Sequence, residues 1–174
     1  MPWSLDASAR LTGVGFTPSA QGGGAEVGAA FALAGGRWLQ LGLGPRLTVD
    51  FTAFSGRFIA LSAALELRAK PHALVWLDLR ATPGLVQVVA SDTIWVVRDG
   101  NLGKGQALVQ TAGRVGLSLG VGLSLRAGST SVRPFARYEQ SLILGFSPAG
   151  GIPLLPLGNV SLGVAVDLGT EGVR

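Results

Sequence analysis

Long stretches of this chain alternate between an apolar residue and a polar or small one, with a period of two. Successive side chains of a β-strand point to opposite faces, so such a stretch predicts a strand with one apolar and one polar face. A helix would instead spread the same leucines around its whole circumference. The clearest stretches are residues 4–12, 39–51, 59–68, 114–127 and 160–168.

Links rich in glycine or proline separate these stretches, and tight links alternate with longer ones along the chain. The pattern predicts an all-β domain over residues 1–174, built as an eight-stranded antiparallel up-and-down barrel. Pro83-Gly84 would add a ninth turn, so we interpret it as a bulge or kink inside one long strand. The tight links are 35–36, 71–72 and 128–129, and the longer ones are 17–24, 52–57, 99–105 and 147–157.

Residues 73–98 and 106–127 then become the two longest strands, joined by residues 99–105. They predict one hairpin that is taller than the others and protrudes from the barrel. Between Gln87 and Val97 the contrast between the two faces is lost, as expected for a segment that passes from one solvent to another. The exposed edges of residues 85–110 would allow a protein partner to pair with this hairpin by strand addition.

The composition of the two faces predicts which of them meets the solvent. The polar face is rich in Gly, Ala and Ser, which suits a narrow barrel interior, whereas the other face is rich in Leu and Val. Only 14% of the residues are charged, against about 25% in an average soluble domain. We therefore expect a transmembrane barrel whose Leu and Val side chains face lipid. Aromatic residues near strand ends fit the girdles of such barrels: Trp3, Phe16, Phe31, Trp38, Phe51, Phe58 and Phe146.

With these strands and faces, the chain resembles the small bacterial outer-membrane β-barrels, the OmpA-transmembrane-domain and OmpX-like group. The resemblance covers nearly the whole chain as a pattern and implies an outer-membrane location, with the tight turns in the periplasm and the longer loops outside the cell. Barrels of this group commonly end in an aromatic residue, whereas this chain ends in Val173-Arg174. The sequence also begins without the basic start and apolar core of a signal peptide.

Charged residues recur on the face assigned to the lumen. Buried charges persist only when they are paired and hydrogen-bonded, so we predict an ion-pair network that fills the lumen. The alternative is a narrow pore that is gated or, because basic residues are in excess, weakly anion-preferring. The core of the predicted network is Arg10, Glu26, Arg46, Asp50, Glu66, Arg68, Asp78, Arg80, Arg114, Arg126, Arg137, Glu139 and Asp167, and Asp6, Lys70 and Arg133 lie on the same face.

Other chemistry finds little support in the sequence. The chain has no cysteine and a single histidine, His72, which we place in a solvated turn rather than in a hydrolase site. Its glycine-rich segments lack the Gly-Lys-Ser/Thr of a phosphate loop, and its basic residues are scattered rather than clustered as in a nucleic-acid binder. We therefore expect no enzymatic activity, no cofactor, no metal site and no nucleic-acid partner.

The sequence thus favours a structural or surface-interaction role, such as adhesion or partner docking, in the bacterial outer membrane. Arg57, Arg98 and Lys104 are predicted to contact the phosphates of lipopolysaccharide. Two alternatives remain open: a small pore, and a soluble lipocalin-like carrier of apolar ligands in which the two faces are exchanged.

Overall fold

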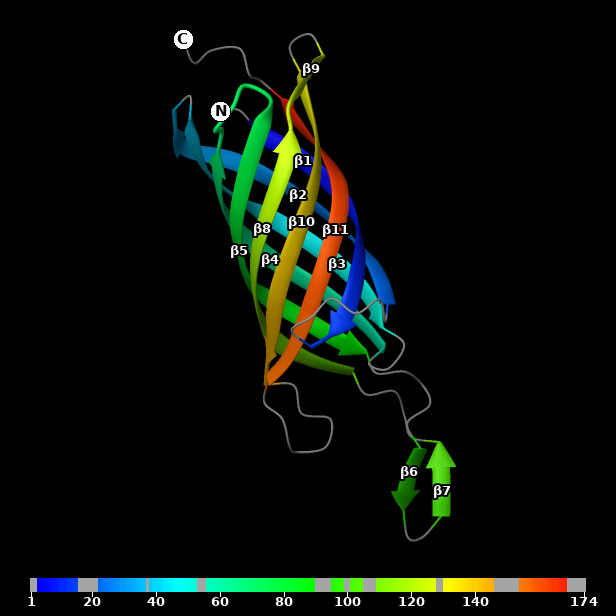
Figure 1. The fold of residues 1–174 in the computed structure, drawn as a ribbon. Coiled ribbons are helices and arrows are strands. Elements are labelled where there is room, and N and C mark those ends of the chain that lie inside the picture. Colours follow the sequence, from blue (N-terminus) through cyan, green and yellow to red (C-terminus); the bar gives the residue numbers. More distant parts are fainter. Residues whose placement is uncertain are drawn as a thin grey trace.

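In a computed structural model the chain forms a closed antiparallel β-barrel whose strands cross the long axis obliquely (Figure 1). The structure describes residues 3–15, 22–36, 38–52, 56–89, 95–98, 101–104, 109–127, 130–145 and 154–168. No helix that is long and apolar enough to cross a membrane occurs among these residues.

Eight long strands make up the wall, as the alternation predicts. Each strand pairs with its neighbours along the chain, and pairing of the last strand with the first closes the ring. A short ninth segment, β9 (Leu125–Ala127), follows β8 and pairs with β10. The strands of the wall are β1 (Trp3–Val14), β2 (Gly22–Gly35), β3 (Leu39–Thr52), β4 (Gly56–Ala69), β5 (Val75–Val89), β8 (Val109–Leu123), β10 (Thr130–Leu144) and β11 (Leu154–Leu168).

The register of the strands fixes their tilt. A path perpendicular to the strands starts at Trp3, crosses every strand and returns to β1 at Gly13, ten residues further on. A barrel of eight strands with this stagger has strands tilted about 40° from its axis. The path runs through Trp3, Phe31, Leu43, Leu65, Ala81, Leu117, Gln140, Gly158 and Gly13.

Pro83-Gly84 lies inside β5 and makes no turn, which confirms its interpretation as an irregularity of one strand. The pairing of β4 with β5 is interrupted between Ser62↔Gly84 and Leu65↔Ala81. Proline has no N–H to donate to the ladder, and this accounts for the gap.

The predicted tall hairpin is not shown. β5 and β8 have 15 residues each, as many as β10 and β11, and their ladder ends at Val89↔Val109. Between them β6 (Trp95–Arg98) pairs with β7 (Asn101–Lys104) in a separate two-stranded sheet. The prediction that residues 99–105 are a loop is therefore wrong for residues 101–104. The rest of this segment lies outside the described residues.

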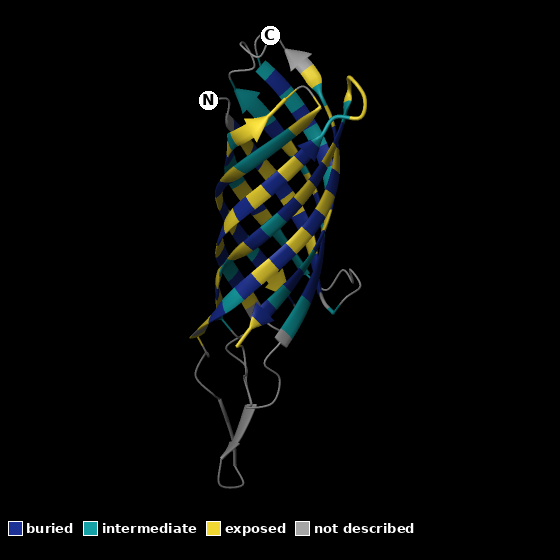
Figure 2. Cartoon of the chain, turned by 90° about the vertical axis from the view of Figure 1, so that its left-hand side faces the viewer, coloured by how far each residue is buried: buried dark blue, intermediate teal, exposed yellow. Residues whose placement is uncertain are grey.

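The two ends of the barrel differ. We call the end that holds the links β2–β3, β4–β5 and β9–β10 the turn end, and the opposite end the loop end. Buried and exposed residues alternate along the strands between these ends (Figure 2). The alternation predicted from the sequence is thus the alternation between lumen and outer surface.

Candidate functional site in the lumen and on the outer wall

The lumen holds the charged side chains and the outer wall holds the large apolar ones. Arg46 and Arg80 are each 1% exposed, whereas Leu119 is 62% and Leu162 is 66% exposed. The predicted network residues lie in the lumen, buried except for Asp167, whose side chain is 16% exposed, and except for Arg126, whose side chain lies outside the described part of the structure. Asp6 and Arg133 are buried with them.

Glu26 of β2 sits at the centre of this network. Its Oε2 accepts a hydrogen bond from Arg10 Nη1 at 2.5 Å, and its Oε1 accepts bonds from Arg46 Nη1 at 3.2 Å and Arg80 Nη1 at 3.1 Å. Arg137 Nη1 lies 3.5 Å from the same Oε1. One carboxylate thus meets four guanidinium groups that come from four other strands.

A second group of contacts joins β1, β3, β4 and β5. Arg46 makes a two-pronged contact with Asp6, with Nη1–Oδ1 at 2.5 Å and Nη2–Oδ2 at 2.7 Å. Glu66 accepts hydrogen bonds from Arg80 Nη2 at 2.8 Å and from Arg68 Nε. Because a two-pronged guanidinium–carboxylate contact fixes orientation as well as distance, it holds both side chains in one arrangement.

Towards the loop end the network continues through Glu139 and Asp50. Glu139 accepts hydrogen bonds from Arg114 Nη2 and from Arg10 Nη2, the latter at 3.2 Å. Asp50 Oδ1 lies 3.3 Å from Arg10 Nε and accepts a hydrogen bond from Thr12 at 3.0 Å.

Two arginines of β10 lie over aromatic rings in addition to their ion-pair contacts. Arg133 Nη2 lies 3.8 Å from Asp167 Oδ1, and its guanidinium carbon lies 5.6 Å from the centre of the Trp76 ring. The guanidinium carbon of Arg137 lies 4.3 Å from the centre of the Phe135 ring. These rings add cation–π contacts to the network.

Small residues in the wall make room for the arginines. A Cβ added to Gly28 would lie 2.5 Å from Arg46 Nη1, and one added to Gly122 would lie 2.9 Å from Arg133 Cγ. Arginines from neighbouring strands thus occupy the space above Gly28 and Gly122, which favours glycine at these two positions of the polar face.

At the loop end one side of the lumen becomes apolar, while Asp50 of β3 lies opposite Phe58 at the same level. The residues that meet there come from the start of β4, β8 and β11 and from the end of β5 and β10. Phe58 was expected in an outer aromatic girdle, and this is wrong: it is an even-numbered residue of β4 and shares the inward face with Ala60, Ser62 and Ala64. We call this cluster the apolar layer: Phe58, Ala60, Val86, Val88, Ala112, Ile143 and Leu157.

Among the described residues, the outer wall is apolar along most of its height, and polar side chains are found near the loop end. Gln87 and Thr111 are exposed there and lie opposite each other on β5 and β8. Arg57 is also exposed and lies 5.3 Å from the centre of the Phe51 ring. Arg98 and Lys104, the other predicted lipopolysaccharide contacts, belong to β6 and β7, and their side chains lie outside the described part of the structure.

No cluster of three or more His, Asp or Glu side chains among the described residues is arranged to hold a metal ion. His72 is exposed in the link between β4 and β5, where its Nδ1 accepts a hydrogen bond from the Leu74 amide at 3.4 Å. The lumen carboxylates are each engaged by arginines, so the arrangement is one of charge pairing rather than of acid–base chemistry.

No protein-family model and no curated protein sequence matches this chain. Among solved structures, the chain is similar to Neisserial surface protein A (NspA), with 16% identity and a TM-score of 0.56 over 95% of each chain. It is also similar to Ail, the attachment invasion locus protein of Yersinia pestis, with 10% identity and a TM-score of 0.56 over 96% of this chain and 98% of that one. At these identities the likeness shows the fold alone. The chain has the fold of the small eight-stranded outer-membrane β-barrels that its sequence pattern resembles.

Proposed function

We propose that this protein is an integral outer-membrane barrel with a closed lumen and a structural or surface-interaction role, without enzymatic activity. One observation carries the proposal: the arginines and carboxylates of the barrel are buried in the lumen, whereas its leucines and valines are mostly exposed on the outer wall. In water such a wall would expose a large apolar surface, whereas in a bilayer that same surface meets acyl chains. A soluble carrier of apolar ligands would need an apolar interior, and the charged lumen argues against it.

A closed lumen is supported by two features of its interior. The ion-pair network occupies the middle of the barrel, and the apolar layer lines one side of the loop end, level with Asp50. Phe58 and Val88 offer nothing that replaces the hydration of an entering ion, and the Asp50 charge beside them is already paired with Arg10. This arrangement argues against the alternative of a small, weakly anion-preferring pore.

The surface role rests on the loop end. We propose that Arg57, Arg98 and Lys104 contact lipopolysaccharide phosphates there and that residues 85–110 offer an edge to a protein partner. NspA is named a surface protein and Ail an attachment invasion locus protein. Ail has also been crystallised with sucrose octasulfate, a heparin analogue, so a barrel of this fold can receive a polyanion.

Extraction and gel migration test the membrane assignment. We expect the protein to need detergent to stay dispersed and to run faster unboiled than boiled on an SDS gel, because a closed ladder resists the detergent until it is heated. A protein that stays dispersed in plain buffer and shows no shift would refute the assignment.

Planar-bilayer recording and lipopolysaccharide binding test the two finer claims. We expect no steady conductance from the purified barrel, and step-like openings would favour the pore. Replacing Arg57, Arg98 and Lys104 by Gln is expected to weaken lipopolysaccharide binding at least tenfold, while Lys70→Gln at the turn end leaves it unchanged. Equal binding by both variants would refute the assigned contacts.

A further inference from the structure

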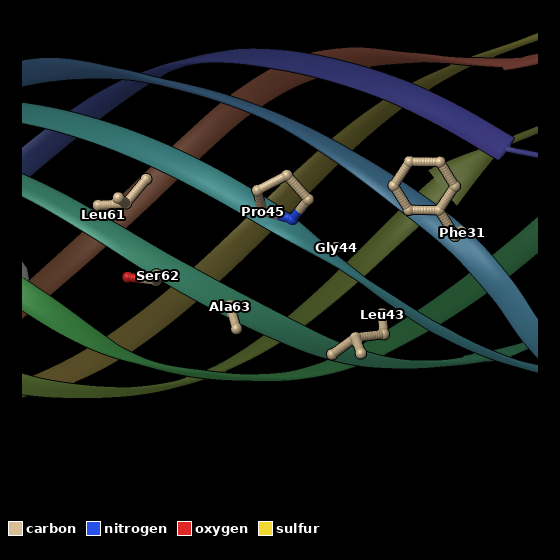
Figure 3. Close-up of a pocket in the computed structure, with 7 residues that line it drawn as sticks. All are labelled: Phe31, Leu43, Gly44, Pro45, Leu61, Ser62 and Ala63. Atoms are coloured by element: carbon tan, nitrogen blue, oxygen red, sulfur yellow. The ribbon is translucent and has the colours of Figure 1, made fainter.

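Among the described residues, the outer wall is hollowed across β2, β3 and β4, with a volume of about 510 Å³ (Figure 3). We call it the outer groove. Its volume lies within the range of ligand pockets, and it has no charged lining residue. The groove is lined by Phe31, Leu43, Gly44, Pro45, Leu61, Ser62 and Ala63.

Small residues in one row across the strands create the groove. Pro45 lies opposite Ala63, and the adjoining registers place Ala29 and Pro83 in the same row. The ladder between β2 and β3 is interrupted between Gly28↔Arg46 and Phe31↔Leu43, where Pro45 has no N–H to donate. Leu61, 64% exposed, and Phe31 stand on either side of this row, as Figure 3 shows, so the hollow is bounded by larger apolar side chains.

The tilt of the strands connects the groove to polar groups nearer the loop end. A step across the wall from β4 to β5 and β8 climbs towards the loop end, because the register advances by ten residues in each circuit. A line parallel to the barrel axis from Pro45 therefore passes Leu61 and Leu85 and reaches Gln87 and Thr111. Arg57 lies on β4, diagonally beside Gln87, since Gln87 pairs with Ile59.

We propose that the outer groove binds one saturated acyl chain of lipid A, the phosphorylated lipid of lipopolysaccharide, in the leaflet on the loop side. The inference rests on the proposed membrane placement and adds a defined lipid site to it. The apolar groove receives the chain, Gln87 and Thr111 hydrogen-bond its ester and amide groups, and Arg57 pairs with a phosphate. The cation at the rim selects the anionic lipid over a zwitterionic phospholipid by charge complementarity.

Native mass spectrometry of the detergent-solubilised barrel with added lipid A tests the site. Ala63→Phe fills the groove with a side chain that faces lipid, so the fold is left intact. Ala7→Phe is the matched control, because Ala7 is an equally small exposed residue on β1, outside the groove. We expect wild type and Ala7→Phe to retain one lipid A per chain, and Ala63→Phe to lose at least tenfold in affinity.

The outcomes separate this inference from the proposed function. If all three proteins are detergent-dependent, heat-modifiable barrels but retain lipid A equally, the groove assignment is wrong while the membrane assignment stands. Equal retention of a zwitterionic phospholipid with matched chains would overturn the lipid A assignment. A two-chain species that Ala63→Phe abolishes would overturn it as well, in favour of a second copy as occupant. Wild type that needs no detergent overturns both proposals.

Discussion

Removing the charge of Glu26 tests whether the lumen network holds the barrel together. The Glu26 carboxylate is 3% exposed and contacts Arg10, Arg46, Arg80 and Arg137 at 2.5 to 3.5 Å. Glu26→Gln keeps the shape of the side chain and leaves these four guanidinium groups one negative charge short. Because the lumen is screened from water, the uncompensated positive charge cannot be solvated without opening the wall.

Breaking a buried ion pair by removing one partner costs about 3–5 kcal/mol of unfolding free energy. We expect a loss in this range for Glu26→Gln. With a denaturant dependence of about 2 kcal/mol per M in urea, the unfolding midpoint would fall by about 2 M. The assay is urea unfolding of the refolded barrel in lipid vesicles, followed by tryptophan fluorescence and by the heat-dependent gel shift.

Asp167→Asn provides the comparison for this measurement. Asp167 is partly exposed and makes longer contacts, 3.3 Å to Arg68 Nη1 and 3.8 Å to Arg133 Nη2. We expect it to cost about 1 kcal/mol or less, as for ion pairs that water can reach. If Glu26→Gln destabilised the barrel no more than Asp167→Asn, the network would not stabilise the barrel and the reasoning would be refuted.

Three further experiments probe the wall and the apolar layer. In a bilayer, Leu119→Arg on the outer wall should lower the unfolding free energy by about 2–4 kcal/mol, and Thr111→Arg by about 1 kcal/mol or less. The reason is that the penalty for arginine falls from the bilayer midplane to the interface. Equal losses for the two variants, measured by unfolding in vesicles, would contradict the placement of the barrel. A Cβ on Gly44 would overlap the carbonyl of Ala29, whereas a Cβ on Gly113 would have its nearest neighbour at 3.6 Å. Gly44→Ala should therefore lower the unfolding free energy by about 3 kcal/mol and Gly113→Ala should leave it almost unchanged, as measured from urea midpoints. Phe58→Ala with Val88→Ala should destabilise the barrel without opening a steady conductance in a planar bilayer, because the ion-pair network below still fills the lumen; step-like currents would show that the apolar layer is the only barrier.

The period-two pattern predicted the strands and their faces because a single rule, an apolar outer face and a cramped polar lumen, acts over most of the wall. Once Arg46 is placed inward, the alternation places Thr48 and Asp50 inward as well, and all three are buried. Pro83-Gly84 was interpreted correctly because an eight-stranded ring leaves no place for another turn there.

The period-two pattern fails to predict the structure near the loop end, where the polarity of the two faces changes. Residues 154–157 were assigned to a loop because Leu154, Leu155, Pro156 and Leu157 do not alternate, yet they open β11 and Leu157 is buried in the lumen. Phe58 was placed outside because an aromatic residue near a strand end suggested a girdle, although its own register pointed inward. The pairing among Arg10, Glu26 and Glu139 comes from three different strands, so no spacing within one segment could have predicted it.

Near the loop end the inner face becomes more apolar and the outer face more polar. This change follows from the need for the two faces of the wall to differ at every level. Where the outer face is apolar, an apolar lumen would make both faces alike, and a register slip of one residue would cost little free energy. Charged lumen residues make such a slip costly, because it would carry Arg46 or Arg80 onto the apolar outer face and leave their carboxylates unpaired. Near the loop end the outer face carries Gln87, Thr111 and Arg57, so the inner face can hold Phe58 and Val88 and still differ from it. We therefore expect a charge in the apolar layer and an apolar side chain in the ion-pair network both to destabilise the barrel. Val88→Arg places an unpaired charge in the apolar layer, and Arg80→Leu leaves Glu66 and Glu26 with one guanidinium fewer.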